Sequence, residues 1–156
     1  MKRNTGQYAQ SHVIALPLIF ILSLIMIATP SYSDYKLVWS DEFEGESIDK
    51  KSWTLESFPG ADSGNFELQH YTDRPENAYL KEGSLVIEAR KEAYKGHEYT
   101  SGILKTKGKR DFKYGRIEAR IKLPSGNGMW PAFWMMPTKE TYGGWAASGE
   151  IDILEA

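Results

Sequence analysis

The sequence predicts an all-β protein, an antiparallel β-sandwich of the jelly-roll type. From Asp34 onward, short runs of β-forming residues recur at close intervals, and Gly- and Pro-containing turns separate them. No stretch places apolar residues at i, i+3, i+4 and i+7 over three turns, as an amphipathic helix would. Aromatic residues make up 13% of the chain. Many short strands joined by such turns are typical of sandwiches and jelly rolls.

The individual strands are predicted from alternation and turn signals. The turn Glu82-Gly83-Ser84 lies between two strand-like runs and predicts a hairpin. The segment 116–122 alternates most regularly, with Ile117 on one face and Arg116 on the other. The segments 58–65 and 138–149 contain Gly and are predicted to be loops. The predicted strands are 35–40, 52–56 with Trp53 pointing inward, 67–71, 78–81, 85–90, 99–107, 116–122, 130–136 and the closing strand from Glu150.

The N-terminus has the pattern of a secretory signal peptide. Lys2 and Arg3 precede an almost wholly apolar run, 13–28, and small residues lie before a cleavage site after Ser33. We therefore expect residues 1–33 to be the signal and 34–156 the secreted part, extracellular or periplasmic. The alternative is an uncleaved N-terminal helix that anchors the protein, although the run is shorter than the ~20 residues that a spanning helix needs.

The composition argues against several classes of binding partner and site. The net charge is -2 and no block of like charge occurs, so nothing favours nucleic acid or an anionic membrane surface. The chain has no cysteine, and its three histidines do not have the spacing of a metal site. The sequence also lacks a Ser-centred nucleophile elbow and a phosphate-binding loop.

The closing stretch, Glu150-Ile151-Asp152-Ile153-Leu154-Glu155-Ala156, carries the clearest chemical signal. Alternation places Glu150 and Asp152 on one strand face, where like charges repel each other. Glu155 is at an odd spacing, so a regular strand would turn it into the core. A β-bulge at Ile153-Leu154 would return it to the face of the other two acids. The alternative is a solvated strand face that carries three acids.

Aromatic and polar residues upstream are candidates for binding a sugar. Trp130 and Trp134 are four residues apart and share one strand face, and indole rings stack on the apolar faces of pyranose rings. Asn65 lies in a predicted loop and can bond a sugar hydroxyl. The alternatives are that both tryptophans pack in the core and that Asn65 is only a turn residue. Trp145 is expected at the rim of a cleft, and Trp39 and Trp53 are interpreted as structural.

Four segments together resemble bacterial laminarinases of glycoside hydrolase family 16. They are Leu37-Val38-Trp39-Ser40-Asp41-Glu42-Phe43, Tyr114-Gly115-Arg116-Ile117-Glu118-Ala119-Arg120-Ile121-Lys122, Trp130-Pro131-Ala132-Phe133-Trp134-Met135 and Gly149-Glu150-Ile151-Asp152-Ile153-Leu154-Glu155. The resemblance implies a jelly roll with a glycan cleft on its concave face and retaining endo-hydrolysis of β-1,3-glucan.

By position, the resemblance implies that Glu150 is the nucleophile, Glu155 the acid/base and Asp152 the assisting acid between them. It implies that Trp130 and Trp134 line sugar subsites. The longer, bulge-containing spacing is similar to that of laminarinases rather than of β-1,3-1,4-specific lichenases. No cofactor is expected to be required. Many members bind a structural calcium, whose ligands the sequence does not place here.

Two other functions are compatible with this sequence. One is a non-catalytic β-glucan-binding protein on the same fold, although such relatives typically lose the acids. The other is a family 16 enzyme that acts on lichenan, agar, carrageenan or xyloglucan. We expect a monomer whose partner is a polysaccharide. If the strand that carries the acids were the last strand of the sheet, one of its edges would be unpaired. Because such acids belong in the middle of a sheet, we expect the jelly roll to lack its C-terminal strands here.

Overall fold

The computed structural model describes residues 35–156, so the predicted signal peptide lies outside the described residues. Within 35–156 the only helical element is the 3-10 helix η1 (Gly60–Ser63), and the all-β prediction is confirmed. No helix in this part is long and apolar enough to cross a membrane. The strands are β1 (Thr54–Leu55), β2 (Phe58–Pro59), β3 (Gln69–Tyr71), β4 (Ala78–Leu80), β5 (Leu85–Ile87), β6 (Arg90–Tyr94), β7 (His97–Ser101), β8 (Leu104–Lys105), β9 (Ala132–Met135) and β10 (Ile151–Glu155).

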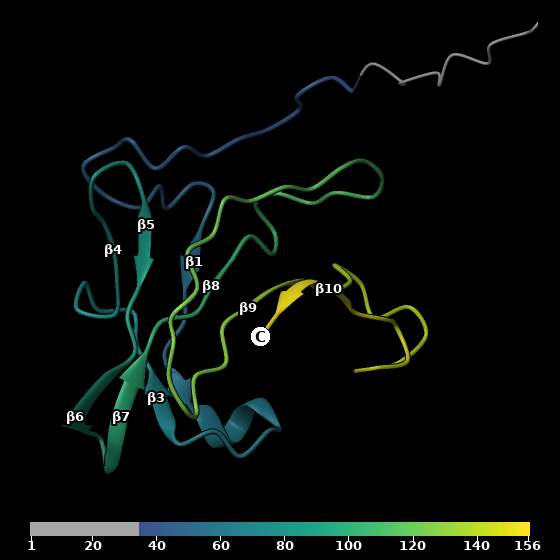
Figure 1. Ribbon diagram of the computed structural model, residues 1–156. Helices are drawn as coiled ribbons and strands as arrows, with labels where there is room; N and C mark the ends of the chain where they lie inside the picture. The colour runs from purple at the N-terminus through teal and green to yellow at the C-terminus, as the bar shows by residue number, and fades with distance from the viewer. Residues whose placement is uncertain (1–34) are drawn as a thin grey trace, which may run out of the picture. The chain divides into compact units, whose positions relative to one another are not determined.

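The largest sheet has four strands in the order β2-β3-β7-β6. Figure 1 shows β3, β7 and β6 side by side. Two of its pairs are antiparallel, but β3 and β7 run parallel. A parallel pair needs a crossover connection, and the segment with β4, β5 and β6 supplies it. The purely antiparallel arrangement predicted from the sequence is therefore wrong for this pair.

The β6–β7 hairpin was not predicted from the sequence. Its turn residues Lys95 and Gly96 have φ angles of 47° and 84°. Positive φ at both central residues is the mark of a type I′ turn, which suits the twist of a hairpin. Gly96 was the available signal, because glycine adopts such angles without a steric cost.

The predicted hairpin around Glu82-Gly83-Ser84 is confirmed. β4 and β5 pair antiparallel, with Ala78 opposite Ile87 and Leu80 opposite Leu85. The predicted strand 99–107, in contrast, is divided into β7 and β8. Gly102 lies in the gap, where a Cβ atom would be 2.8 Å from the carbonyl oxygen of Asn77. Only glycine leaves room for this close approach of the two backbones.

A buried polar cluster links the connection between β3 and β4 to strand β7. Thr72, Asn77 and Thr100 have 0% exposure. The Asn77 amide nitrogen donates to the Thr100 hydroxyl at 2.9 Å, and its amide oxygen accepts from Thr72 at 2.5 Å. Thr100 in turn donates to the Glu92 carboxylate at 2.5 Å. These three buried side chains therefore have partners, which offsets the cost of burying them, whereas neither ring nitrogen of the buried His70 has a hydrogen bond within residues 35–156.

Two predicted strands are absent from the part of the chain that the structure describes. Segments 35–40 and 116–122 pair with no strand in 35–156, and 116–122 is exposed throughout. Alternation makes a chain amphipathic, but a strand forms only where a neighbour bonds its N–H and C=O groups.

Trp39 and Trp53, which the sequence predicted to be structural, pack against each other. Their ring centroids are 5.9 Å apart. Trp53 Nε1 donates to an Asp41 carboxylate oxygen at 2.8 Å.

Candidate active site

The candidate site is built on the β9–β10 hairpin. The two strands are antiparallel, with Asp152 opposite Trp134 and Glu155 opposite Ala132. Between Asp152 and Leu154 the register shifts, so that Ile153 has no partner of its own. This shift is the β-bulge that the odd spacing of Glu155 predicted, and the prediction is confirmed.

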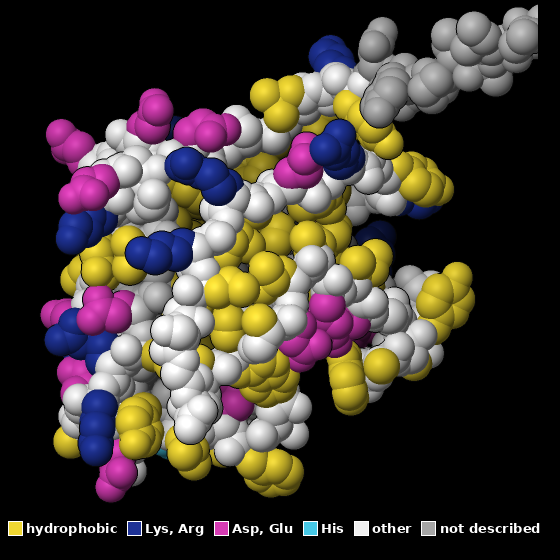
Figure 2. All heavy atoms as spheres, in the orientation of Figure 1, with side chains coloured by type: hydrophobic (Ala, Val, Ile, Leu, Met, Phe, Trp, Pro, Cys, Tyr) yellow, Lys and Arg dark blue, Asp and Glu magenta, His cyan; other side chains and the backbone are white. Residues whose placement is uncertain are grey.

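The bulge determines which side chains share a face. Directly opposite residues of an antiparallel pair lie on the same face. Ala132 and Trp134 are two residues apart on β9, so their partners Glu155 and Asp152 lie on one face. Continued alternation places Glu150, two residues before Asp152, on that face as well. Figure 2 shows acidic side chains gathered beside hydrophobic ones in the region of β10.

The opposite face of the hairpin is partly covered. Phe133, Met135 and Leu154 are half-buried, whereas Ala132, Trp134 and Asp152 are exposed. One side of the ribbon is therefore partly buried, although Ile151 there is 64% exposed, and the carboxylate side is open to solvent. A polymer can approach this open side without displacing the core.

Three tryptophans stand beside the acids, two of them as hydrogen-bond donors. Trp130 Nε1 donates to Glu155 Oε1 at 2.9 Å. Trp145 Nε1 donates to Glu150 Oε2. Trp134 lies opposite Asp152 and is 40% exposed, so it is not a core residue. Sequence reasoning placed Trp145 at a cleft rim but missed both hydrogen bonds, because strand alternation gives no information on the reach of an indole.

Asn65 is not brought into the site by any recorded contact. It follows η1 and Gly64 in an exposed turn, and its backbone N–H donates to Ser63 Oγ at 3.4 Å. Within residues 35–156 no hydrogen bond links Asn65 to the acids of β10. Its local geometry is that of a turn residue, which was the alternative interpretation of the sequence.

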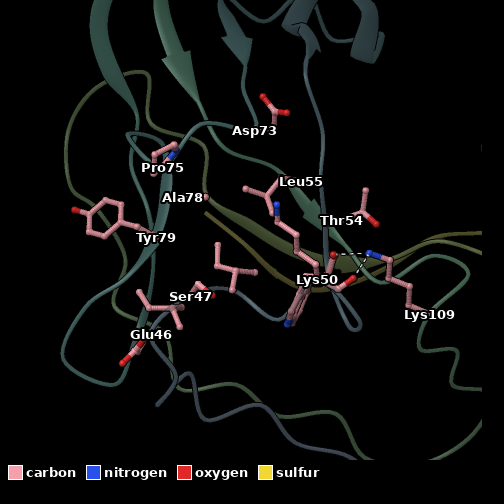
Figure 3. Close-up of a pocket in the computed structure, with 13 residues that line it drawn as sticks. Glu46, Ser47, Lys50, Thr54, Leu55, Asp73, Pro75, Ala78, Tyr79 and Lys109 are labelled. Atoms are coloured by element: carbon pink, nitrogen blue, oxygen red, sulfur yellow. Dashed lines mark hydrogen bonds between the residues drawn. The ribbon is translucent and has the colours of Figure 1, made fainter.

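The described residues contain no metal-binding cluster, and the cavity beside β1 and β4 is not lined by the acids of β10. In the described part of the chain, no group of three or more His, Asp or Glu side chains is arranged to hold a metal ion. A cavity of about 470 Å³ is lined by residues of β1 and β4 and by Lys50 and Lys109. Figure 3 shows Lys109 reaching across to backbone oxygens, with both of its bonds, to Lys50 and Trp53, 2.6 Å long. None of the predicted site residues lines this cavity.

The exposed face of β9–β10 has the groups that glycoside hydrolysis requires. Two carboxyl groups must flank the scissile bond, one as the acid and one as the base or nucleophile. Aromatic side chains beside them give flat apolar surface for sugar rings. The arrangement is that of a carbohydrate-active site on an all-β scaffold.

Comparison with known proteins establishes the family. Residues 65–156 match the model of Glycosyl hydrolases family 16, and the chain belongs to this family. It is 47% identical over 147 residues to the Beta-glucanase of Rhodothermus marinus, covering 87% of this chain and 51% of the relative. It is 42% identical over 141 residues to Glucan endo-1,3-beta-glucosidase A1 of Niallia circulans, covering 81% of this chain and 21% of the relative.

Solved structures agree with the fold. The X-ray structure of the laminarinase from Rhodothermus marinus aligns with a TM-score of 0.74 and 50% identity. The alignment covers 78% of this chain and 49% of that structure. The chain thus spans about half the length of these Rhodothermus relatives. The jelly-roll class predicted from the sequence is confirmed by this likeness and by the family.

Proposed function

We propose that this chain carries the catalytic strand of a secreted, retaining endo-glycosidase that hydrolyses β-1,3-glucan. The observation that supports it most is the bulge at Ile153, which brings Glu155 to the face of Glu150 and Asp152. An isolated row of acids on a solvated surface would gain nothing from this irregularity. The substrate class follows from the relatives, whose names specify β-glucan and β-1,3-glucan.

In the proposed mechanism, Glu155 acts on the oxygen and Glu150 on the carbon of the bond that breaks. The Glu155 carboxyl group gives its proton to the glycosidic oxygen as the C–O bond breaks. A Glu150 carboxylate oxygen forms a bond to the anomeric carbon, which gives a glycosyl-enzyme. Water then attacks that carbon, Glu155 takes a proton from the water, and Glu150 is released as a carboxylate.

Asp152 and the tryptophans have supporting roles in this proposal. Asp152 lies between the two glutamates on β10, and its negative charge favours retention of a proton on a neighbouring carboxyl group. Trp134 and Trp130 present exposed rings beside the acids, with 40% and 53% exposure. We propose that these two rings stack against sugar rings. For Asn65 the proposal is a hydrogen bond to a sugar hydroxyl.

The proposal includes export of the protein. The basic start, apolar run and small residues before position 34 have the order of a cleavable signal. A polysaccharide too large to enter a cell has to be cut outside it. N-terminal sequencing of the mature protein would test this, with Asp34 as the expected first residue. An intact residue 1 in membrane fractions would instead support the anchored alternative.

The test of the activity is an assay of the full-length protein on laminarin. We expect reducing ends to appear with retention of anomeric configuration, and Glu150→Gln to lower turnover by about 10³-fold or more. Glu140→Gln, in the exposed loop before β10, is the matched control and should act like the wild type. Normal turnover by Glu150→Gln would remove the assignment.

Two further results of the same assay would redirect the proposal. Laminarin binding without release of reducing ends would indicate a glucan-binding protein. Release from lichenan, agar, carrageenan or xyloglucan in preference to laminarin would keep the chemistry and change the substrate. A panel of these glycans, compared at equal protein concentration, separates the three outcomes.

A further inference from the structure

We propose that Trp130 and Trp145 are positioning residues, each of which holds one carboxyl group by its indole N–H. One oxygen of each glutamate is then fixed, and the other is left for chemistry. The inference rests on the proposed function, which assigns Glu155 as acid/base and Glu150 as nucleophile. It adds which oxygen of each group acts and which side chain selects it.

Trp130 is placed to hold Glu155 from across the hairpin. It lies two residues before Ala132, the register partner of Glu155, and therefore on the same side of the ribbon. Its Nε1 donates to Glu155 Oε1 at 2.9 Å. An indole N–H is a donor only. It can bond the same oxygen whether Glu155 is a carboxylate or a neutral acid, so the proton is directed to Oε2.

Trp145 holds Glu150 from the preceding loop. Glu150 directly precedes β10, and Trp145 is five residues earlier in the segment 138–149. Its Nε1 donates to Glu150 Oε2, which leaves Oε1 as the oxygen that attacks the anomeric carbon. Because Glu150 lies outside the paired residues of β10, the strand ladder alone does not fix it.

Orientation is needed because the acids are exposed. Glu150 and Glu155 are long side chains on the open face of the hairpin, and apolar packing does not limit their rotamers. Attack and protonation depend on the alignment of the reacting atoms. A single fixed oxygen removes most of the freedom of each carboxyl group. The indole hydrogen bonds therefore orient the carboxyl groups at the two ends of the strand, as core packing orients buried catalytic groups.

The competing explanation is that both indoles serve only as stacking surfaces for sugars. Trp134 provides the control, because it shares the exposed face but has no hydrogen bond to a carboxylate within residues 35–156. Substitution by Phe keeps an aromatic ring and removes the donor. Because the phenyl ring is smaller, a stacking role should be weakened to a similar degree in all three Phe variants, whereas a positioning role should be lost only in Trp130→Phe and Trp145→Phe.

The experiment compares aryl β-laminaribiosides in the full-length protein. A 2,4-dinitrophenyl group leaves without protonation, whereas a phenyl group needs the general acid. Values of kcat/KM report the steps up to formation of the glycosyl-enzyme, before Glu155 acts as a base. For Trp130→Phe we expect kcat/KM to fall about tenfold or more on the phenyl substrate and to stay within about twofold on the dinitrophenyl substrate.

Trp145→Phe should behave differently, because the nucleophile is needed for every leaving group. We expect its kcat/KM to fall by a similar factor, about tenfold, on both substrates and mainly through kcat. Trp134→Phe should raise KM and leave the ratio of the two substrates as in the wild type. That ratio is measured on one preparation, so it does not depend on the fraction of protein that is folded.

The outcomes separate this inference from the proposed function. An unchanged substrate ratio in Trp130→Phe, with an active wild type, would overturn the positioning role and leave the hydrolase intact. Equal KM effects in all three Phe variants would assign the indoles to stacking alone. A wild type that cleaves neither laminarin nor the aryl substrates would overturn both.

Discussion

Replacement of Asn77 by Ala is predicted to destabilise the domain by about 4 kcal/mol. Asn77 has 0% exposure, and both ends of its side-chain amide are in use. The amide oxygen accepts from Thr72 Oγ1 at 2.5 Å and from Arg74 Nη2 at 3.0 Å. The amide nitrogen donates to the Glu88 carbonyl oxygen and to Thr100 Oγ1, both at 2.9 Å.

The magnitude follows from what these partners do when the amide is removed. Each of the lost bonds contributes about 1 kcal/mol net. Thr100 and Arg74 retain Glu92 as a partner, so they are not left unsatisfied. The buried hydroxyl of Thr72 loses its acceptor, and the Glu88 carbonyl loses a donor. Their unmet bonds keep the total near the sum of the bonds instead of below it.

The measurement is urea unfolding of the full-length protein, followed by tryptophan fluorescence. We expect Asn77→Ala to lower the midpoint with an unchanged slope, since a loss of stability alone does not alter the surface exposed on unfolding. Asn65→Ala is the control, because Asn65 is exposed, and its effect should lie within about 0.5 kcal/mol. A loss below about 1 kcal/mol for Asn77→Ala would refute the argument that this buried network holds the sheet.

Three further predictions address the backbone, a buried histidine and the bulge. Gly60→Ala should destabilise by about 1–3 kcal/mol in urea unfolding, because its Cβ would lie 2.6 Å from a carbonyl oxygen of β3; Gly144→Ala, with no atom within 4 Å, should be neutral. Burial lowers the pKa of His70 below its usual 6.5. The unfolded chain therefore takes up the proton first, and stability falls as the pH drops below 6.5; His70→Phe should flatten this dependence, and an unchanged slope would contradict it. Deleting Ile153 removes the bulge but leaves Glu155 at even spacing from Glu150, on the same face, so laminarin hydrolysis should persist. An Ala inserted directly before Glu155 should turn Glu155 to the other face and reduce hydrolysis by about 10²–10⁴-fold.

The bulge was predictable from the sequence because two requirements conflicted there. Strict alternation would have put Glu155 in the core, where an unpaired charge is costly. Only an extra residue in β10 satisfies both the apolar pattern and the charge. The β4–β5 hairpin was predictable for a similar reason, since Glu82-Gly83-Ser84 admits few backbone paths between two strand-like runs.

The remaining features depend on contacts between distant segments, which local patterns do not record. The parallel pairing of β3 with β7 is set by a crossover between them. Segment 116–122 alternates as well as any strand, yet it pairs with nothing in 35–156. The indole bonds to Glu150 and Glu155 depend on side-chain reach across a turn or a ladder. Sequence reasoning identified the acids and the aromatic residues, but not which indole serves which acid.

Strand pairing and the indole hydrogen bonds position different carboxyl groups of the site. Asp152 lies in the ladder, opposite Trp134, so its position follows from strand pairing. Glu155 is the last residue of β10, and Glu150 lies just before the first. The bulge fixes which face the glutamates share, but it cannot orient carboxyl groups at the ends of a strand. An insertion that turns Glu155 to the other face should therefore alter which residues meet the substrate, whereas substitutions of the indoles should alter how well the same residues react.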